Sequence, residues 1–370
     1  MDAKMIKEEK SVAKQLKLTN YFLGFICSFI FVYILIALKQ ILIPVIIAIF
    51  LTYLFHPLLV FMYNKYKIPK WVTLILLLIF NLLVYYLLGL VIASNLNTFT
   101  QRMDFYTESL YKSLTSILST FNLTLQEFIE FFNIDLANLS VNSVLQQLVN
   151  TGIIQSFFTA VSSLLGDSFI AMFFWVFMIL GKSKFEERLK LAFSGKVDVV
   201  EKNLHSINSQ LQSYIVIKTI LSLITGAIAT VILTIYGIDF AIFWGILTFV
   251  LNYIPNIGSL IATIFPILIA LLEYGFGFTS LSLAALLVIN QNIVGNVIEP
   301  HFLGRRMDLS PVFVLFSLIF WGWIWGIVGM FLAVPIAALM KILFNNIEAL
   351  KPISVLIGSK AELTGSRKIN

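Results

Sequence analysis

Charged residues are scarce in this chain of 370 residues: they make up 12% of it, whereas hydrophobic residues make up 59%. A soluble protein of this length has too small an interior to hide so much apolar surface. The mean hydropathy is +0.95, and several apolar runs approach or exceed the roughly 20 residues that cross a ~30 Å hydrocarbon core. The composition therefore excludes a soluble globular protein and predicts a multi-pass protein of the plasma membrane.

Cysteine and histidine are nearly absent as well. Cys27 is the single cysteine, so the chain has no disulfide framework and no cysteine-based metal site. The three histidines, His56, His205 and His301, lack metal-ligand spacing, and the motifs of metalloproteases, P-loop enzymes and serine hydrolases are missing. We therefore predict that the chain is not an enzyme and uses no metal or cofactor. The net charge of +6 is concentrated in a few loops, which points to membrane orientation rather than nucleic-acid binding.

Eight apolar segments predict an all-α polytopic membrane protein with about six full transmembrane helices and two broken helical hairpins. Full spans are expected at 20–37, 41–62, 71–93, 154–180, 214–236 and 279–299, and the two longer apolar runs are 240–272 and 311–344. The segments group into a basic N-terminus (1–19), N-terminal transmembrane helices (20–97), an amphipathic helical segment (98–153), a transmembrane helix (154–181), a basic linker (182–213), a transport core (214–345) and a tail (346–370).

Lysine and arginine mark the side of the membrane on which each loop lies, because cytoplasmic loops carry an excess of them. The N-terminus, the loop 63–70, the linker 182–213 and the tail are basic. The segment 98–153 is poor in lysine and arginine. We therefore expect both termini in the cytoplasm and the amphipathic segment 98–153 outside. The partner that the composition implies first is the lipid bilayer.

The two long apolar runs, 240–272 and 311–344, are each interrupted near the middle. A straight helix of 33 residues would be about 50 Å long, too long for one simple crossing. Each half has about 13–17 residues, which suits a re-entrant segment better than a full span. Re-entrant hairpins leave Arg305 and Arg306 in the cytoplasm, whereas single long helices would place them outside. We favour the hairpins, with single helices as the alternative.

A short internal repeat accompanies the two breaks. Gly258 opens the sequence Gly-Ser-Leu-Ile-Ala and is followed by Pro266, while Gly329 opens Gly-Met-Phe-Leu-Ala and is followed by Pro335. Two span-plus-hairpin units of opposite orientation would be typical of a transporter with inverted repeats. The alternative is that these residues, together with Gly326, serve only the close packing of membrane helices.

The first break has the sequence Asn-Tyr-Ile-Pro-Asn-Ile-Gly. Pro255 removes a backbone donor and disfavours helix at the residue before it, and Gly258 permits a sharp turn. Asn252 and Asn256, beside Tyr253, can satisfy freed backbone groups or bind a solute. Non-helical backbone at membrane depth survives only where protein buries it or it lines a cavity. We therefore predict a substrate or ion site here, with a plain surface loop as the alternative.

A second polar cluster ends the apolar span 279–299. On a helix, Asn292, Asn296 and Glu299 fall at i, i+4 and i+7 and share one face. Gln291 and Pro300 belong to the same cluster. We predict that this face lines a substrate or ion pathway.

Glu299 is the only carboxylate of this cluster. An ionisable group near membrane depth is a functional candidate, here for carrying a proton or attracting a cation. The alternative is that Glu299 lies at the interface and pairs with Arg305 or Arg306. Elsewhere, Ser310 and Pro311 predict the start of the last apolar helix, and Asp239 predicts a cap between two helices.

The second half resembles the autoinducer-2 exporter (AI-2E) family of bacterial membrane proteins over about residues 205–345. The resembling motifs are "NYIPNIG" followed by Pro266, "QNIVGNVIEPHFLG", "LSPVFVL" and "GIVGMFLAVPIAAL". The resemblance implies a secondary transporter or exporter that forms homo-oligomers. Members are associated with autoinducer-2 export and some with sodium/proton exchange. The family often has an acidic residue between the Gln and the Asn of the motif "QNIVGNVIEPHFLG". Val294 takes that position here, so a carboxylate role in cation coupling would fall to Glu299.

Two functions remain open from the sequence. The first is a transporter that moves a small polar solute outward, with coupling to H⁺ or Na⁺ as one option. The second is a non-transporting membrane scaffold or assembly factor that acts through the external segment 98–153 or the linker 182–213. Apolar residues on the external segment need a surface to pack on in either case. We favour the transporter.

Overall fold

A computed structural model describes residues 2–120, 169–181, 197–303, 309–345 and 350–358, together with Gly166, Arg188 and Leu191. Within these ranges every regular element is helical, and the only β contact is an isolated bridge between Leu309 and Gly358. Among the described residues, six helices are long and apolar enough to cross a membrane. The prediction of an all-α polytopic membrane protein is therefore confirmed.

These six apolar helices are not the same six segments that the sequence predicted as full spans. They are α2 (Lys39–Tyr66), α3 (Lys70–Gln101), α8 (Val197–Ile235), α10 (Ile257–Tyr274), the segment Phe278–Phe302 and α13 (Pro311–Asn345). The expected span 20–37 lies within α1 (Asp2–Ala37), whose apolar part is Phe22–Ala37, and the expected span 154–180 is described over Phe169–Gly181. The α10 and α13 helices belong to the runs expected to form hairpins, so length and composition alone do not distinguish a span from a hairpin arm.

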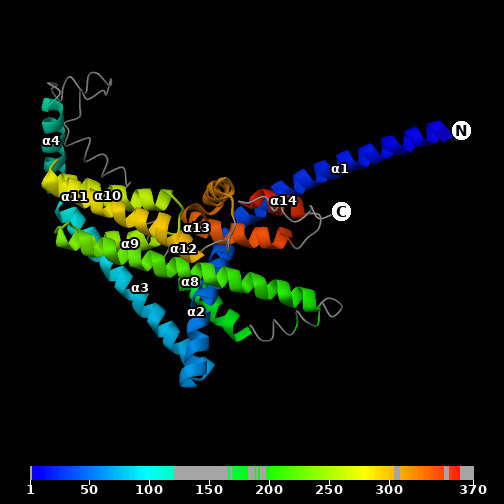
Figure 1. Ribbon diagram of the computed structural model, residues 1–370, viewed down its shortest axis with the longest axis horizontal. Helices are drawn as coiled ribbons and strands as arrows, with labels where there is room; N and C mark the ends of the chain where they lie inside the picture. The colour runs from blue at the N-terminus through cyan, green and yellow to red at the C-terminus, as the bar shows by residue number, and fades with distance from the viewer. Residues whose placement is uncertain are drawn as a thin grey trace, which may run out of the picture.

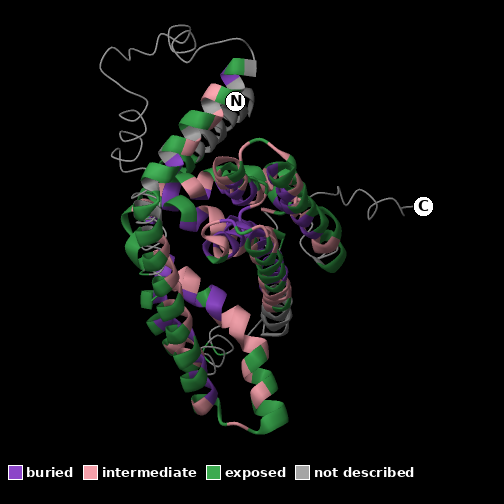
Figure 2. Ribbon diagram, turned by 90° about the vertical axis from the view of Figure 1, so that its left-hand side faces the viewer, coloured by how far each residue is buried: buried purple, intermediate pink, exposed green. Residues whose placement is uncertain are grey.

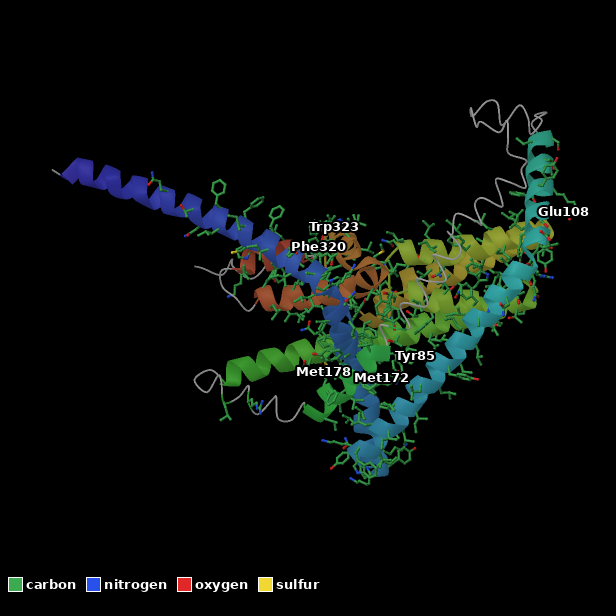
Figure 3. The ribbon with its side chains drawn as sticks, turned by 180° about the vertical axis from the view of Figure 1, so that it is seen from behind. Tyr85, Glu108, Met172, Met178, Phe320 and Trp323 are labelled. Atoms are coloured by element: carbon green, nitrogen blue, oxygen red, sulfur yellow. The ribbon has the colours of Figure 1, made fainter. Side chains whose placement is uncertain are left out.

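The N-terminal helices surround a small cluster of their own. The α1 helix (Asp2–Ala37) runs without a break across residue 19, where the predicted basic N-terminus ends. It projects away from the rest of the molecule, and α2 and α3 form a V below it (Figure 1). The helix Phe169–Gly181 packs against α2 and α3. Met172 and Met178 of this helix lie in the same apolar cluster as Tyr85 of α3 (Figure 3).

The α8 helix is the central element of the second half. It contacts α2, α9 (Ala241–Leu251), α11 (Phe278–Asn292) and α13. It begins at Val197, inside the predicted linker 182–213, and continues without interruption into the predicted span. Its inward side buries three polar side chains, Lys218, Ser222 and Thr225. Buried residues gather where these helices cross (Figure 2).

The first predicted break separates α9 from α10. The N–H of Ile257 donates to the carbonyl oxygen of Pro255 at 2.6 Å, and Asn256 has φ 60° and ψ −51°. A hydrogen bond that spans a single residue at a positive φ defines a γ-turn of the rare, strained kind. The two helices pack against each other, and a Cβ on Gly258 would lie only 1.7 Å from the carbonyl oxygen of Leu251. This glycine lets the two arms of the first hairpin meet.

The second predicted break lies within α13. Gly326 has φ 64° and ψ −143°, so the helix is interrupted there. The hydroxyl of Ser317 donates to the carbonyl oxygen of Ala333 at 2.9 Å, whereas sixteen residues of straight helix would separate them by about 24 Å. The chain therefore folds back on itself, and Gly329 packs against the carbonyl of Trp321 as Gly258 does against Leu251. That either hairpin re-enters the membrane stays a prediction.

The segment after the first hairpin is not a regular helix. The α11 helix passes into a π-helical stretch, η1 (Ile293–Ile298), and then into α12 (Glu299–Leu303). Such π turns often occur at functional sites. The predicted span 279–299 is thus present, but its last third is wound more loosely than an α-helix.

The α4 helix (Met103–Thr120) is the described start of the predicted segment 98–153; residues 121–153 lie outside the described part. Asp239 does not cap α9, since Phe240 holds the capping position without a side-chain bond. The carboxylate of Asp239 instead pairs with Arg102 and accepts a hydrogen bond from the Tyr106 hydroxyl at 2.6 Å. Burial and this carboxylate raise the pKa of Tyr106 well above its usual range. The prediction of a cap was wrong: Asp239 joins α4 to the core.

The α14 helix (Lys351–Ile357) closes the base of the second hairpin. α13 begins at Pro311 as predicted, and the N–H of Ser310 donates to the carbonyl oxygen of Ile357 at 2.8 Å. The hydroxyl of Ser354 donates to the carbonyl oxygen of Lys341 at 3.1 Å. The short α14 helix therefore contacts both ends of α13.

Candidate functional site

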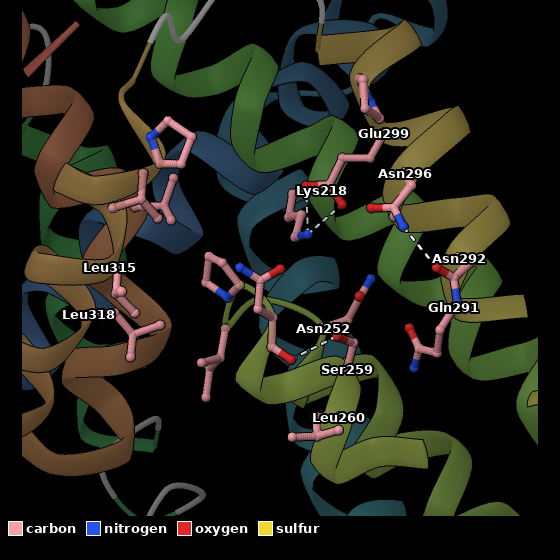
Figure 4. A pocket seen from close by; sticks show the side chains of 18 of the residues that line it. Lys218, Asn252, Ser259, Leu260, Gln291, Asn292, Asn296, Glu299, Leu315 and Leu318 are labelled. Carbon is pink, nitrogen blue, oxygen red and sulfur yellow. Dashed lines mark hydrogen bonds and ion pairs between the residues drawn. The ribbon is translucent and has the colours of Figure 1, made fainter. Parts of the chain in front are cut away.

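A cavity of about 860 Å³ lies between α8, the tip of the first hairpin, the α11–α12 segment and α13 (Figure 4). Its size falls within the range of small-molecule sites. The polar side chains that line it are Tyr214, Lys218, Asn252, Asn256, Ser259, Thr263, Gln291, Asn292, Asn296 and Glu299. Four segments far apart in the sequence therefore meet at one polar pocket.

The residues of the first break divide into two groups. Asn252, Pro255 and Asn256 line the cavity, and the amide of Asn252 also donates to the Ser222 hydroxyl at 3.1 Å. Tyr253 does not line the cavity and lies in a buried apolar cluster instead. It is 3% exposed, and its hydroxyl donates to Thr219. Tyr253 and Gly258, both singled out from the sequence, thus shape the tip rather than line the pocket.

The predicted polar face of residues 292–299 does reach the cavity. Gln291, Asn292, Asn296, Glu299 and Pro300 all line it. The amide of Asn296 donates to the side-chain oxygen of Asn292 at 2.9 Å, across the π turn. The opposite wall carries Leu315 and Leu318 of α13 (Figure 4). One wall of the cavity is therefore rich in amides and the facing wall is apolar.

The partner of Glu299 is Lys218, which was not singled out from the sequence. Its Nζ atom lies 2.7 Å from both Oε1 and Oε2 of Glu299 (Figure 4). The lysine side chain is 6% exposed and that of Glu299 is 20% exposed. Arg305 and Arg306, the partners considered from the sequence, lie outside the described residues. Lys218 is the only charged residue of the apolar run 214–236. A lone charge within such a run is the sequence feature that could have identified Lys218 as a functional candidate.

The second break does not reach the cavity. Gly326, Gly329 and Pro335 are absent from the lining, which α13 supplies instead through apolar side chains such as Val314, Leu318 and Val334. Near the tip, the indole N–H of Trp325 donates to the carbonyl oxygen of Leu35 on α1 at 3.1 Å. The tip of the second hairpin is therefore attached to α1.

The charged side chains that line the described cavity sum to a net charge near zero. Lys218 and Glu299 are the only charged residues in its described lining, and they cancel. No group of three metal-binding side chains occurs among the described residues. The side-chain amides of Asn256 and Gln291 make no hydrogen bond within the described part of the chain. Their donors and acceptors are free to bind a polar solute.

The AI-2E family transporter profile matches residues 22–349, a range that includes both hairpins, α8 and the Glu299 segment. The chain belongs to the AI-2E transporter family. It is 30% identical to the AI-2 transport protein TqsA of Escherichia coli over 86% of this chain and 89% of that protein. It is 32% identical to a putative transport protein of Haemophilus influenzae, over 86% and 90% of the two chains. A putative transport protein of Borreliella burgdorferi is 28% identical over 88% and 87%.

Membership of the AI-2E family identifies the chain as a membrane transporter. The six long apolar helices agree with a multi-pass protein of the plasma membrane. The family resemblance seen in the sequence is therefore confirmed, and it extends well beyond residues 205–345, to nearly the whole chain.

Proposed function

We propose that this AI-2E transporter is a secondary transporter that exports a small polar solute through the cavity between α8 and the first hairpin. The observation that supports this most is the meeting of a broken helix, a row of amides and a charged pair in one pocket of about 860 Å³. Secondary transporters place substrate sites at such broken helices. The residues proposed to contact the solute are Asn252, Asn256, Gln291, Asn296 and Glu299.

The shape of the cavity suggests a class of solute. A compact molecule with several hydroxyl or carbonyl groups on one side could bind the amides of Asn256 and Gln291. Its less polar side could rest on Leu315 and Leu318. Small sugar derivatives such as autoinducer-2 have this character, and the relative TqsA is named an AI-2 transport protein. Coupling of transport to H⁺ or Na⁺, including exchange as an antiporter, would involve Glu299, the one carboxylate of the described lining.

The proposed topology has two units of opposite orientation. α8 and the first hairpin would form one unit, with the hairpin entering and leaving from outside. The α11–α12 segment and the second hairpin would form the other, with its hairpin opening to the cytoplasm. The matching positions of Gly258 and Gly329 support this arrangement. Both termini and the linker 182–213 would be cytoplasmic, because they are basic.

Alternating access would follow from movement of one unit against the other. The cavity lies where α8 and α10 of the first unit meet the α11–α12 segment and α13 of the second. Rocking or sliding at this seam would expose the amides to each side in turn. We expect the transporter to form homo-oligomers, since α1 to α3 carry many exposed apolar side chains that lipid or a second copy would cover.

Flux in proteoliposomes tests the proposed function. Release of an autoinducer-2-like sugar derivative would be followed with and without a pH or Na⁺ gradient, for the wild type and for Glu299→Gln. The variant removes a charged hydrogen bond worth about 1.5–3 kcal/mol, so flux should fall about tenfold or more. Wild-type release equal to that of empty liposomes for every polar solute tried would contradict the proposal and favour the scaffold function.

Glu108→Gln is the matched control. Glu108 also pairs with a lysine, Lys112, at 2.6 Å, and this contact holds its pKa below the usual range. It lies exposed on α4 (Figure 3) and is not among the residues that line the cavity. Flux should be unchanged in this variant. An equal loss of flux in both variants would show that the loss does not arise in the cavity.

A further inference from the structure

The ammonium group of Lys218 lies where an inorganic cation would bind a carboxylate. Its Nζ atom is 2.7 Å from both carboxylate oxygens of Glu299, so it contacts the two oxygens symmetrically. Lys218 comes from α8 and Glu299 from the start of α12, 81 residues apart in the sequence. The pair therefore joins α8 to the α11–α12 segment through one positive charge.

The cavity around Glu299 is lined by oxygen-bearing side chains of the kind that a cation site uses, and the lysine takes the cation's place beside the carboxylate. Hard cations such as Na⁺ prefer carboxylate, amide and hydroxyl oxygens. Tyr214, Asn292 and Asn296, which line the same cavity, carry such oxygens. A carboxylate that is four-fifths buried needs a positive partner. Lys218 supplies it from within the chain, and the pair leaves no net charge to attract another ion.

We propose that Lys218 acts as a tethered cation that determines the specificity of the transport site. It occupies the position that Na⁺ would take at Glu299, excludes inorganic cations from the cavity, and reserves the site for an electrically neutral polar solute. This inference rests on the proposed function for its role in transport, and it narrows that function by removing Na⁺ as the coupling ion. Removal of the lysine side chain should convert the cavity into a Na⁺ site.

A merely structural ion pair makes different predictions. If Lys218 only held α8 to α12, its replacement would lower stability equally in every salt. If it stands in for a cation, the loss of stability should be repaired selectively by small cations that fit between the oxygens. The dependence of stability on the identity of the cation therefore separates the two roles.

The first measurement is thermal unfolding of the full-length protein in detergent, with NaCl or choline chloride at equal ionic strength. Wild type, Lys218→Met and Lys218→Met/Glu299→Gln are compared at pH 7 and at pH 9. Lys112→Met is the matched control, because it breaks a lysine–glutamate contact of similar length that lies exposed on α4.

The wild type should unfold at the same temperature in both salts. Lys218→Met should be stabilised by Na⁺ in a saturable way, with a rise in Tm of about 2 °C at ten times the dissociation constant. The double variant and Lys112→Met should show no such response. A folded Lys218→Met that does not respond to Na⁺ at either pH would overturn the proposal.

A second measurement decides the matter if Lys218→Met does not fold. Na⁺ should leave the Tm of the wild type and of Glu299→Gln equally unaffected. Stabilisation of the wild type by Na⁺ that disappears in Glu299→Gln would show that Na⁺ binds beside the lysine, and would overturn the proposal. These unfolding experiments need no transported solute, so a failure of the flux assay and a failure of this inference remain distinguishable.

Discussion

Replacing the two hairpin glycines by alanine should destabilise the protein more than most single substitutions. A Cβ on Gly258 would lie 1.7 Å from the carbonyl oxygen of Leu251, and a Cβ on Gly329 would lie 1.9 Å from that of Trp321. Ordinary contacts of this kind begin at 3.4 Å, so each pair of arms would have to separate by roughly 1.5 Å. Backbone atoms cannot avoid the clash by rotating, as a side chain could.

The expected loss of stability is at the upper end of the range for overpacked interiors, about 3 kcal/mol for each glycine. Thermal unfolding in detergent, together with the monodispersity of the purified protein, measures it. Gly89→Ala is the matched control, because Gly89 lies within α3 and a Cβ there would meet nothing within 4 Å. That variant should be as stable as the wild type or slightly more so, since alanine favours helix over glycine by about 1 kcal/mol.

The comparison also tests whether the two hairpins are built alike. Both glycine variants should lose stability by similar amounts, because the two contacts have nearly the same length. If Gly258→Ala and Gly329→Ala unfolded at the same temperature as Gly89→Ala, the arms would not pack as closely as described, and the hairpin geometry would be refuted.

Three further predictions concern the hairpin tip and the two attachments of the core. Asn256→Gly should be more stable than Asn256→Ala by about 1 kcal/mol in thermal unfolding, because glycine tolerates φ 60°. Asp239→Asn should weaken the attachment of α4 by less than about 1 kcal/mol, because the Arg102 partner of Asp239, just before α4, is half-exposed; hydrogen exchange should rise in α4 and stay constant in the hairpins. Ser354→Ala should cost about 1 kcal/mol and raise exchange at the C-terminal end of α13, and unchanged exchange would show that α14 does not hold it.

The sequence predicted correctly those features of the structure that depend on a few adjacent residues. Pro255 and Gly258 identified the first break because proline and glycine act on the backbone beside them. The start of α13 at Pro311 followed from the same kind of rule. The alignment of Asn292, Asn296 and Glu299 on the cavity survived the π turn, since one extra residue in a turn rotates a helical face only partly.

The partners of these residues could not be predicted in the same way. Lys218 pairs with a residue 81 positions away, and only the packing of α8 against α12 brings the two together. Asp239 was expected to cap a neighbouring helix but pairs with Arg102, 137 positions earlier. The position of Tyr253 within the apolar core, rather than in the cavity, depends on Phe331 of the second hairpin. Long-range packing decides these contacts, and a local pattern carries no information about it.

The two hairpins share their construction but differ in what their tips present. Each places a glycine against a backbone carbonyl of the opposite arm. The first tip carries Asn252 and Asn256 and lines the cavity, whereas the second carries Trp325, which is bonded to α1. An element that binds the solute must be able to change its surroundings, and an element attached to a peripheral helix is better suited to stay in place. The asymmetry therefore favours the first hairpin, with Lys218 behind it on α8, as the part that moves during transport.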